Sequence, residues 1–127
     1  MAQPRPTRRK LIGVGPSLND LGGMPQKIKE TFGNGLRQAQ SGAYPEDSRP
    51  VGEGLPREVL KLVENHDGDT YRAAFVVSFP ECVYLLHVFK KSAAGIGTPR
   101  PVIETIRARL AAAREHHRIN YGSGEKR

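Results

Sequence analysis

Tryptophan is absent from this chain, cysteine occurs once, and no apolar run is long. The single cysteine, Cys82, excludes an internal disulfide framework and is typical of a protein in a reducing compartment. No run approaches the roughly 18–20 apolar residues that a membrane-spanning helix needs. The basic N-terminal segment lacks the apolar stretch of a signal peptide. We therefore expect a cytoplasmic protein with no membrane partner.

Positive charge is abundant and unevenly distributed. The 127 residues, enough for one domain, carry a net charge of +7. Residues 1–37 hold seven Arg or Lys against two acids, and residues 87–118 repeat that ratio. Residues 38–86 reverse it, with four against eight. Two basic segments flanking an acidic one favour a polyanion or an acidic protein as partner, although a solubilising charge would have the same composition.

The N-terminal third predicts an arm, a strand and two helices. Residues 1–9, rich in Pro and Arg, predict a disordered basic arm. Lys10–Gly15 is short and apolar, as in an edge strand, and Ser17 is placed to cap a short helical turn. Pro25 suits the first turn of a longer helix that reaches about Gln40. Its apolar positions recur at helical spacing: Ile28, Phe32, Leu36 and Ala39.

The rest of the chain predicts an antiparallel meander and a closing helix. Residues 41–57 are turn-rich and indicate a surface connection. Three partly β-branched segments follow, at 58–65, 70–79 and 82–90, and Asp67-Gly68 between the first two is a strong hairpin signal. A last helix runs from Pro101 to about His117. We expect one α+β domain over residues 10–118, in which N-terminal helices and a C-terminal helix pack on a small antiparallel sheet, and a flexible tail over 119–127.

Hairpin register predicts which strand residues share a face. We assume two-residue turns at Asp67-Gly68 and at Pro80-Glu81, and side chains that alternate along each strand. One face then holds the apolar set Leu60, Leu62, Tyr71, Ala73, Phe75, Val77, Phe79, Tyr84, Leu86 and Val88. The opposite face, expected to be open, holds Val59, Lys61, Val63, Arg72, Ala74, Val76, Val83, Leu85, His87, Phe89 and Lys91. Its four polar groups can all be cationic, and clustered positive charge favours an anionic ligand.

These cations suit RNA cleavage that uses no metal ion. The substrate's own 2′-hydroxyl attacks the adjacent phosphate, Arg and Lys stabilise the growing negative charge, and a His or a Lys with a lowered pKa moves protons. Each residue also has a simpler interpretation: a structural histidine, an arginine paired with a neighbouring acid, or a solvated strand end. Histidine and cysteine lack metal-ligand spacing, and nucleotide-binding and serine-nucleophile motifs are absent from the sequence. We expect no metal and no cofactor.

The chain resembles the phage-related RelE/HigB-like toxins of type II toxin–antitoxin systems over roughly residues 10–118. The resemblance rests on Gly68-Asp69-Thr70-Tyr71-Arg72, on the run from Val83 to Ser92 that contains His87-Val88-Phe89-Lys90-Lys91, and on Gly95-Ile96-Gly97-Thr98-Pro99. In the N-terminal half, Gly15-Pro16-Ser17-Leu18, Pro25 and Gln40-Ser41-Gly42 occur in the expected order, and Arg107-Ala108-Arg109-Leu110 matches the last helix. The chain departs at Lys61, where members commonly have an acidic residue.

The resemblance implies a RelE-like fold and an endoribonuclease that cuts mRNA, usually on the translating ribosome, without a metal. It implies a cognate antitoxin that often carries a helix-turn-helix DNA-binding domain. By this resemblance and the face pattern, the catalytic candidates are Arg72, His87, Lys90 and Lys91. The RNA-binding candidates are Lys61, Arg107 and Arg109.

Two alternatives remain open at the level of sequence. A non-catalytic toxin on the same fold, such as a ParE-type gyrase poison, would tolerate loss of the basic cluster. A nucleic-acid-binding protein of phage origin would not be toxic on expression. A neighbouring gene for a small helix-turn-helix protein would favour either toxin.

Overall fold

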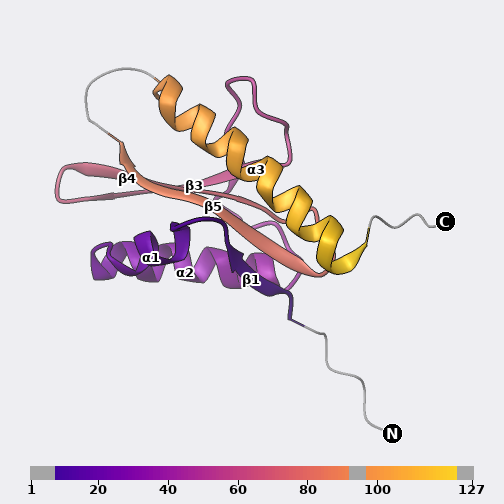
Figure 1. Ribbon diagram of the computed structural model, residues 1–127. Coiled ribbons are helices and arrows are strands. Elements are labelled where there is room, and N and C mark those ends of the chain that lie inside the picture. Colours follow the sequence, from indigo (N-terminus) through magenta and orange to yellow (C-terminus); the bar gives the residue numbers. More distant parts are fainter. Residues whose placement is uncertain (1–7, 92–96, 123–127) are drawn as a thin grey trace, which may run out of the picture.

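The chain folds as three layers, with a sheet between N-terminal and C-terminal helices (Figure 1). The computed structural model describes residues 8–91 and 97–122. Its elements are β1 (Lys10–Gly13), α1 (Ser17–Gly22), α2 (Gln26–Gln40), β2 (Arg49–Pro50), β3 (Val59–His66), β4 (Asp69–Val76), β5 (Cys82–Lys91) and α3 (Arg100–Tyr121). The expected α+β class is confirmed. Within the described ranges, no helix combines the length and apolarity needed to cross a membrane.

The sheet has five strands in the order β1-β5-β4-β3-β2, two more than the predicted meander. Strand β2 lies in the segment that we expected to be a surface connection, and it pairs with the start of β3. Strand β1 runs parallel to β5, with Leu11 opposite Val83, so the sheet is mixed rather than purely antiparallel. The β1–β5 pairing joins residues about 70 positions apart, and local periodicity carries no information about such a partner.

The β3–β4 hairpin has the predicted register. His66 pairs with Asp69, Val63 with Arg72, and Lys61 with Ala74. Asp67 and Gly68 have φ angles of 52° and 82°, as expected for both central positions of a two-residue hairpin turn. Arg72 and Lys61 therefore lie on the same face of the sheet.

The predicted β4–β5 register holds at one end only. Arg72 pairs with Phe89 and Ala74 with His87, as expected, but Phe75 then pairs with Leu85, which leaves Leu86 as an extra residue on β5. The expected two-residue turn at Pro80-Glu81 is wrong, because β4 already ends at Val76. A bulge of this kind bends the strand and shifts its alternation by one residue.

The bulge reverses the two faces of β5 relative to the prediction for the residues that precede it, up to Leu86, whereas His87, Val88 and Phe89 keep their predicted faces. Tyr84 and Leu86 pack toward α3, and Val83 and Leu85 pack toward the N-terminal helices. Phe79 also joins the α3 side. The α2 residues Ile28, Phe32, Leu36 and Ala39 are fully buried against the sheet, as predicted.

The face that we expected to be open is covered by α3. Ile103, Ile106 and Leu110 bury one side of this helix against Val59, Ala74, Val76 and the β5 residues of that face. Figure 1 shows α3 crossing the sheet opposite α1 and α2. The predicted cationic residues of this face must therefore lie beside or under α3.

One local expectation at the N-terminal end was wrong. Ser17 does not cap α1: it is fully buried, and its hydroxyl donates to the carbonyl oxygen of Leu85 at 2.8 Å. The same oxygen accepts the N–H of Val14, so this end of the chain is fastened to β5. In the predicted arm, residues 1–7 lie outside the described residues, whereas Arg9 donates its backbone N–H to Gln40 and its Nη1 to the carbonyl oxygen of Val77.

The C-terminal helix is longer than predicted. Helix α3 continues to Tyr121, four residues beyond the expected end near His117 and into the range predicted as a tail. Residues 123–127 of that range lie outside the described residues.

The β3–β4 turn makes a stability prediction. Gly68 has positive φ and a Cβ placed there would meet nothing within 4 Å, so the cost of Gly68→Ala comes from the backbone alone. We expect a loss of about 1–2 kcal/mol in the free energy of unfolding, measured by urea denaturation. The control is Gly22→Ala, where Cβ also has open space and φ is not positive. Equal stability of the two variants would contradict the turn assignment.

Candidate nucleic-acid interface

Arg72 lies on β4 beside the start of α3 and contacts the segment that leads into this helix. Its Nη1 donates to the hydroxyl of Thr98 at 3.2 Å. Its Nε is buried and has no hydrogen-bond partner among the described residues. A guanidinium with an unused buried donor is costly, so Arg72 is not the freely exposed strand residue that the sequence suggested. Its guanidinium group is directed toward Thr98 by this hydrogen bond.

Lys61 and Arg49 add positive charge next to Arg72. Lys61 lines the same small cavity as Arg72, Phe89 and Thr98. Arg49 pairs with Lys61 across the β2–β3 ladder. Partial burial lowers the pKa of Lys61, and the charges of Arg72 and Arg49 lower it further. Three cations from three strands therefore share one region of the face, and the proton on Lys61 is easier to remove than on an ordinary lysine.

An acidic side chain enters this region from the β2–β3 connection. Glu53 accepts the backbone N–H of Thr98 at 2.9 Å. This hydrogen bond is the largest cause of its lowered pKa, and the charges of Lys61 and Arg72 act in the same direction. The predicted face pattern covered the strands only, so it did not include this acidic loop residue. The sequence signal for this loop was the pair of glycines on either side of Glu53, because such a pair favours backbone conformations with positive φ.

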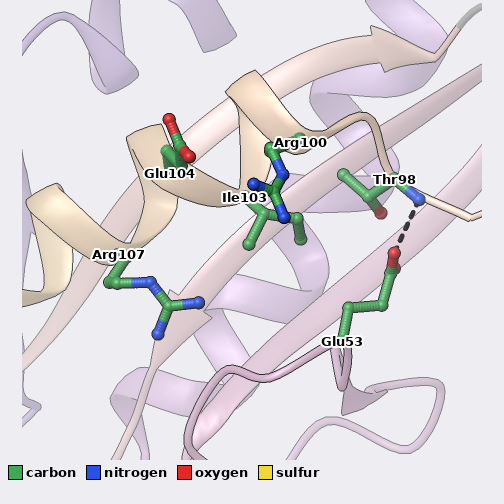
Figure 2. Close-up of a pocket in the computed structure, with 6 residues that line it drawn as sticks. All are labelled: Glu53, Thr98, Arg100, Ile103, Glu104 and Arg107. Carbon is green, nitrogen blue, oxygen red and sulfur yellow. Dashed lines mark hydrogen bonds between the residues drawn. The ribbon is translucent and has the colours of Figure 1, made fainter.

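A cleft of about 370 Å³ opens beside Glu53 at the N-terminal end of α3. Figure 2 shows Arg100 and Arg107 extending from α3 on the side of the Glu53 loop, and Glu104 pointing away from it. Arg107 also approaches the carbonyl oxygen of Gly54, at 3.4 Å. Two further guanidinium groups thus line the approach to the Arg72 region, and one of them, Arg107, is a predicted RNA-binding residue.

His87 and Arg109 form a separate pair. Arg109 Nη1 lies 2.9 Å from His87 Nδ1 and 3.0 Å from the carbonyl oxygen of Leu86. Because a guanidinium only donates, Nδ1 must accept, which places the proton of the neutral ring on Nε2. Burial lowers the pKa of His87, the charge of Arg109 lowers it further, and Asp20 opposes them. The ring stacks on Phe89, with centroids 4.9 Å apart.

Helix α3 separates these two groups of candidate residues. Positions 107 and 109 are about 200° apart around a helix, so their side chains leave α3 on opposite flanks. Lys61, Arg72 and Arg107 gather on the flank that faces the β2–β3 loop, and His87 lies with Arg109 on the other. The seven predicted site residues therefore do not form one cluster.

The two strand-end lysines lie on opposite faces. Lys90 pairs with Tyr71, points to the α2 side and makes an ion pair with Asp69 at 3.6 Å. Lys91 pairs with Thr70 on the α3 side of the sheet, the side that carries Arg72. The geometry places Lys91, rather than Lys90, on the face of the cationic group.

Two further histidines, His116 and His117, have structural partners at the far end of α3. His116 bonds to the hydroxyl of Tyr84 at 2.7 Å, and His117 bonds to Glu81 at 2.6 Å. In the described part of the chain, no three His, Cys, Asp or Glu side chains converge as metal ligands would. These contacts pin the C-terminal half of α3 to β5 and to the turn that precedes it.

Comparison with known proteins identifies one family. The model of the family described as "Phage derived protein Gp49-like (DUF891)" matches residues 19–111, which span α1 to the middle of α3 and include all of the candidate residues. Neither the curated proteins nor the solved structures contain a significant match.

The His87–Arg109 pair makes a prediction about pH. The pKa of His87 is lowered from 6.5 in the folded state, so below pH 6.5 the unfolded chain binds more protons. Stability contributed by the neutral ring is complete above pH 6.5 and declines as the pH falls toward the folded-state pKa. In His87→Gln, we expect the unfolding free energy to vary less with pH between 5 and 7. Parallel wild-type and variant curves from urea denaturation would show that the pKa of His87 is not lowered by folding.

Proposed function

Because the chain belongs to the Gp49-like family of phage-derived proteins, we propose that it is a RelE/HigB-like toxin of a type II toxin–antitoxin system and cleaves mRNA. The observation that carries this proposal is the meeting of Lys61 and Arg72 at Thr98, next to an open cleft, with Arg49 paired to Lys61 on the same face. Anionic ligands with regularly spaced charges, as in an RNA backbone, suit such a surface. The resemblance of the residues around Arg72 and Lys91 to RelE/HigB-like toxins supports the same assignment.

In this proposal, Arg72 and Lys61 act on the scissile phosphate. Lys61, in its neutral form, accepts the proton of the 2′-hydroxyl, and the 2′-oxygen attacks the adjacent phosphorus. The bond to the 5′-oxygen breaks, that oxygen takes a proton from water, and the ammonium of Lys61 gives its proton to the hydroxide so formed. The products are a 2′,3′-cyclic phosphate and a 5′-hydroxyl. Arg72 stabilises the additional negative charge on the phosphate oxygens. The lowered pKa of Lys61 supports its role as the base.

The other candidates have supporting roles. Arg100 and Arg107 line the cleft and bind neighbouring phosphates, and Lys91 extends the cationic face along β5. His87 lies on the other flank of α3, so in this proposal it holds Arg109 in place and does not contact RNA.

The proposed partners are the ribosome, which presents the mRNA, and a cognate antitoxin with a helix-turn-helix DNA-binding domain. Acidic groups of the antitoxin would pair with the cations around Arg72 and so block access of RNA. Paired charges at such an interface contribute mostly to slow dissociation. The reaction would take place in the cytoplasm, where translating ribosomes are found.

Substitution of Arg72 tests the catalytic proposal. We expect Arg72→Ala to lower the rate of mRNA cleavage by about 10²–10³-fold, the usual effect of removing one charge-stabilising donor. The measurements are cleavage in a translation extract and growth arrest after induction. The matched control is Arg37→Ala, because Arg37 is an exposed arginine on α2, on the other side of the sheet. Arg72→Ala protein that is folded by circular dichroism and fully active would remove Arg72 from the site.

Chelation and salt test the chemistry. We expect cleavage of purified RNA, assayed without ribosomes because these need Mg²⁺, to persist in excess EDTA, since the proposed step needs no metal ion. RNA affinity should fall steeply with salt, because each phosphate contact releases counterions. Loss of cleavage in EDTA with recovery on adding a divalent ion would contradict the proposed chemistry. Growth arrest without RNA cleavage would favour a non-catalytic toxin instead.

A further inference from the structure

The cationic region around Arg72 already contains an anion, and the chain itself supplies it. The carboxylate of Glu53 accepts the backbone N–H of Thr98 at 2.9 Å. It also interacts with the hydroxyl of Thr98 and with the charges of Lys61 and Arg72. A backbone N–H, a hydroxyl, an ammonium and a guanidinium are also the donors that bind phosphate groups. Glu53 therefore occupies a position that is chemically suited to a phosphate.

The backbone around Glu53 is arranged to bring the carboxylate to this position. Gly52, Glu53 and Gly54 all have positive φ, at 75°, 55° and 86°. Positive φ is unfavourable for a glutamate, so the conformation needs compensation from its contacts. The opposite side of the contact is also specialised: a Cβ on Gly97 would lie 3.0 Å from Oε1 of Glu53. Only glycine at position 97 allows this close approach without displacement.

The contact can open without disturbing the core. Glu53 is exposed, lies between two glycines, and borders the 370 Å³ cleft between its loop and α3. If its side chain turns into the cleft, Arg100 and Arg107 line the surface that it would approach. The donors of Thr98, Arg72 and Lys61 would then be available to another anion.

We propose that Thr98, Arg72 and Lys61 form a phosphate-binding site that Glu53 occupies in the free protein, and that a phosphate of single-stranded RNA displaces this carboxylate on binding. The identity of the ligand as RNA rests on the function proposed above. The carboxylate of Glu53 competes with the RNA backbone for the same donors. The protein therefore binds RNA more weakly than it would without this carboxylate.

The test measures binding separately from cleavage. A fluorescent 2′-O-methyl oligonucleotide lacks the attacking hydroxyl and stays intact, so anisotropy titrations report affinity alone. Glu53→Gln removes the charge but keeps an oxygen that can accept the Thr98 N–H. We expect it to bind about tenfold more tightly than the wild type at low salt. The matched control is Glu104→Gln, which removes an acid from the same cleft but not from Thr98, and which should change affinity less than twofold.

A second measurement follows the site directly. In the wild type, the amide resonance of Thr98 should shift on addition of the oligonucleotide, because its N–H changes its acceptor. Equal or weaker binding by Glu53→Gln, an equal gain in Glu104→Gln, or an unmoved Thr98 resonance would overturn the proposal. Thermal unfolding by circular dichroism establishes that each variant is folded before it is compared.

The outcomes distinguish this proposal from the proposed function. If Glu53→Gln binds the oligonucleotide more tightly but the wild-type protein cleaves no RNA, the phosphate site stands and the ribonuclease assignment fails. If cleavage depends on Arg72 but Glu53→Gln binds no more tightly, the ribonuclease assignment stands and Glu53 is not a competitor. Unchanged binding with lost cleavage in Glu53→Gln would also overturn the proposal, because Glu53 would then take part in the reaction.

Discussion

The bulge in β5 is the constraint on which the rest of the structure depends. Strand β5 lies between β1 and β4 and is covered on both faces, so its side chains must serve two apolar layers. The extra residue, Leu86, places Leu85 toward the N-terminal helices and Leu86 itself toward α3. A bulge also leaves backbone groups outside the regular ladder. The carbonyl oxygen of Leu86 accepts a hydrogen bond from the guanidinium of Arg109, which links α3 to the strand at this point.

The placement of α3 determines which candidate residues can act together. Its far end is held by the bonds of His116 to Tyr84 and of His117 to Glu81. The hydrogen bond from His117 is also the largest cause of the lowered pKa of Glu81. With its middle fixed at Arg109 and its far end fixed at these histidines, the helix lies along the sheet with its first turn beside Arg72. The helix thereby divides the cationic residues of this face of the sheet into two groups, one on each flank of α3.

Electrostatics explains why the site region contains an acid. Arg49, Lys61 and Arg72 repel one another, and partial burial of Lys61 increases the cost of its charge. The carboxylate of Glu53 offsets part of this repulsion. An RNA phosphate would have the same effect. Glu53 therefore influences both the stability of the free protein and the affinity of this site for an anion. The carboxylate of Glu53 and an RNA phosphate therefore compete for the same cations.

Local sequence signals determined the elements of this protein, and only the tertiary structure decided their assembly. The apolar spacing from Ile28 to Ala39 predicted α2 and its buried side, and Asp67-Gly68 determined the β3–β4 register that places Lys61 and Arg72 on one face. These features depend on residues a few positions apart, which a single sequence contains. The parallel partner of β1, the bulge at Leu86 and the covering of the cationic face by α3 depend on packing between distant segments. The position of Glu53 against Thr98, 45 residues away along the chain, follows from that packing, because the packing of α3 on the sheet places the segment that leads into this helix beside the β2–β3 loop.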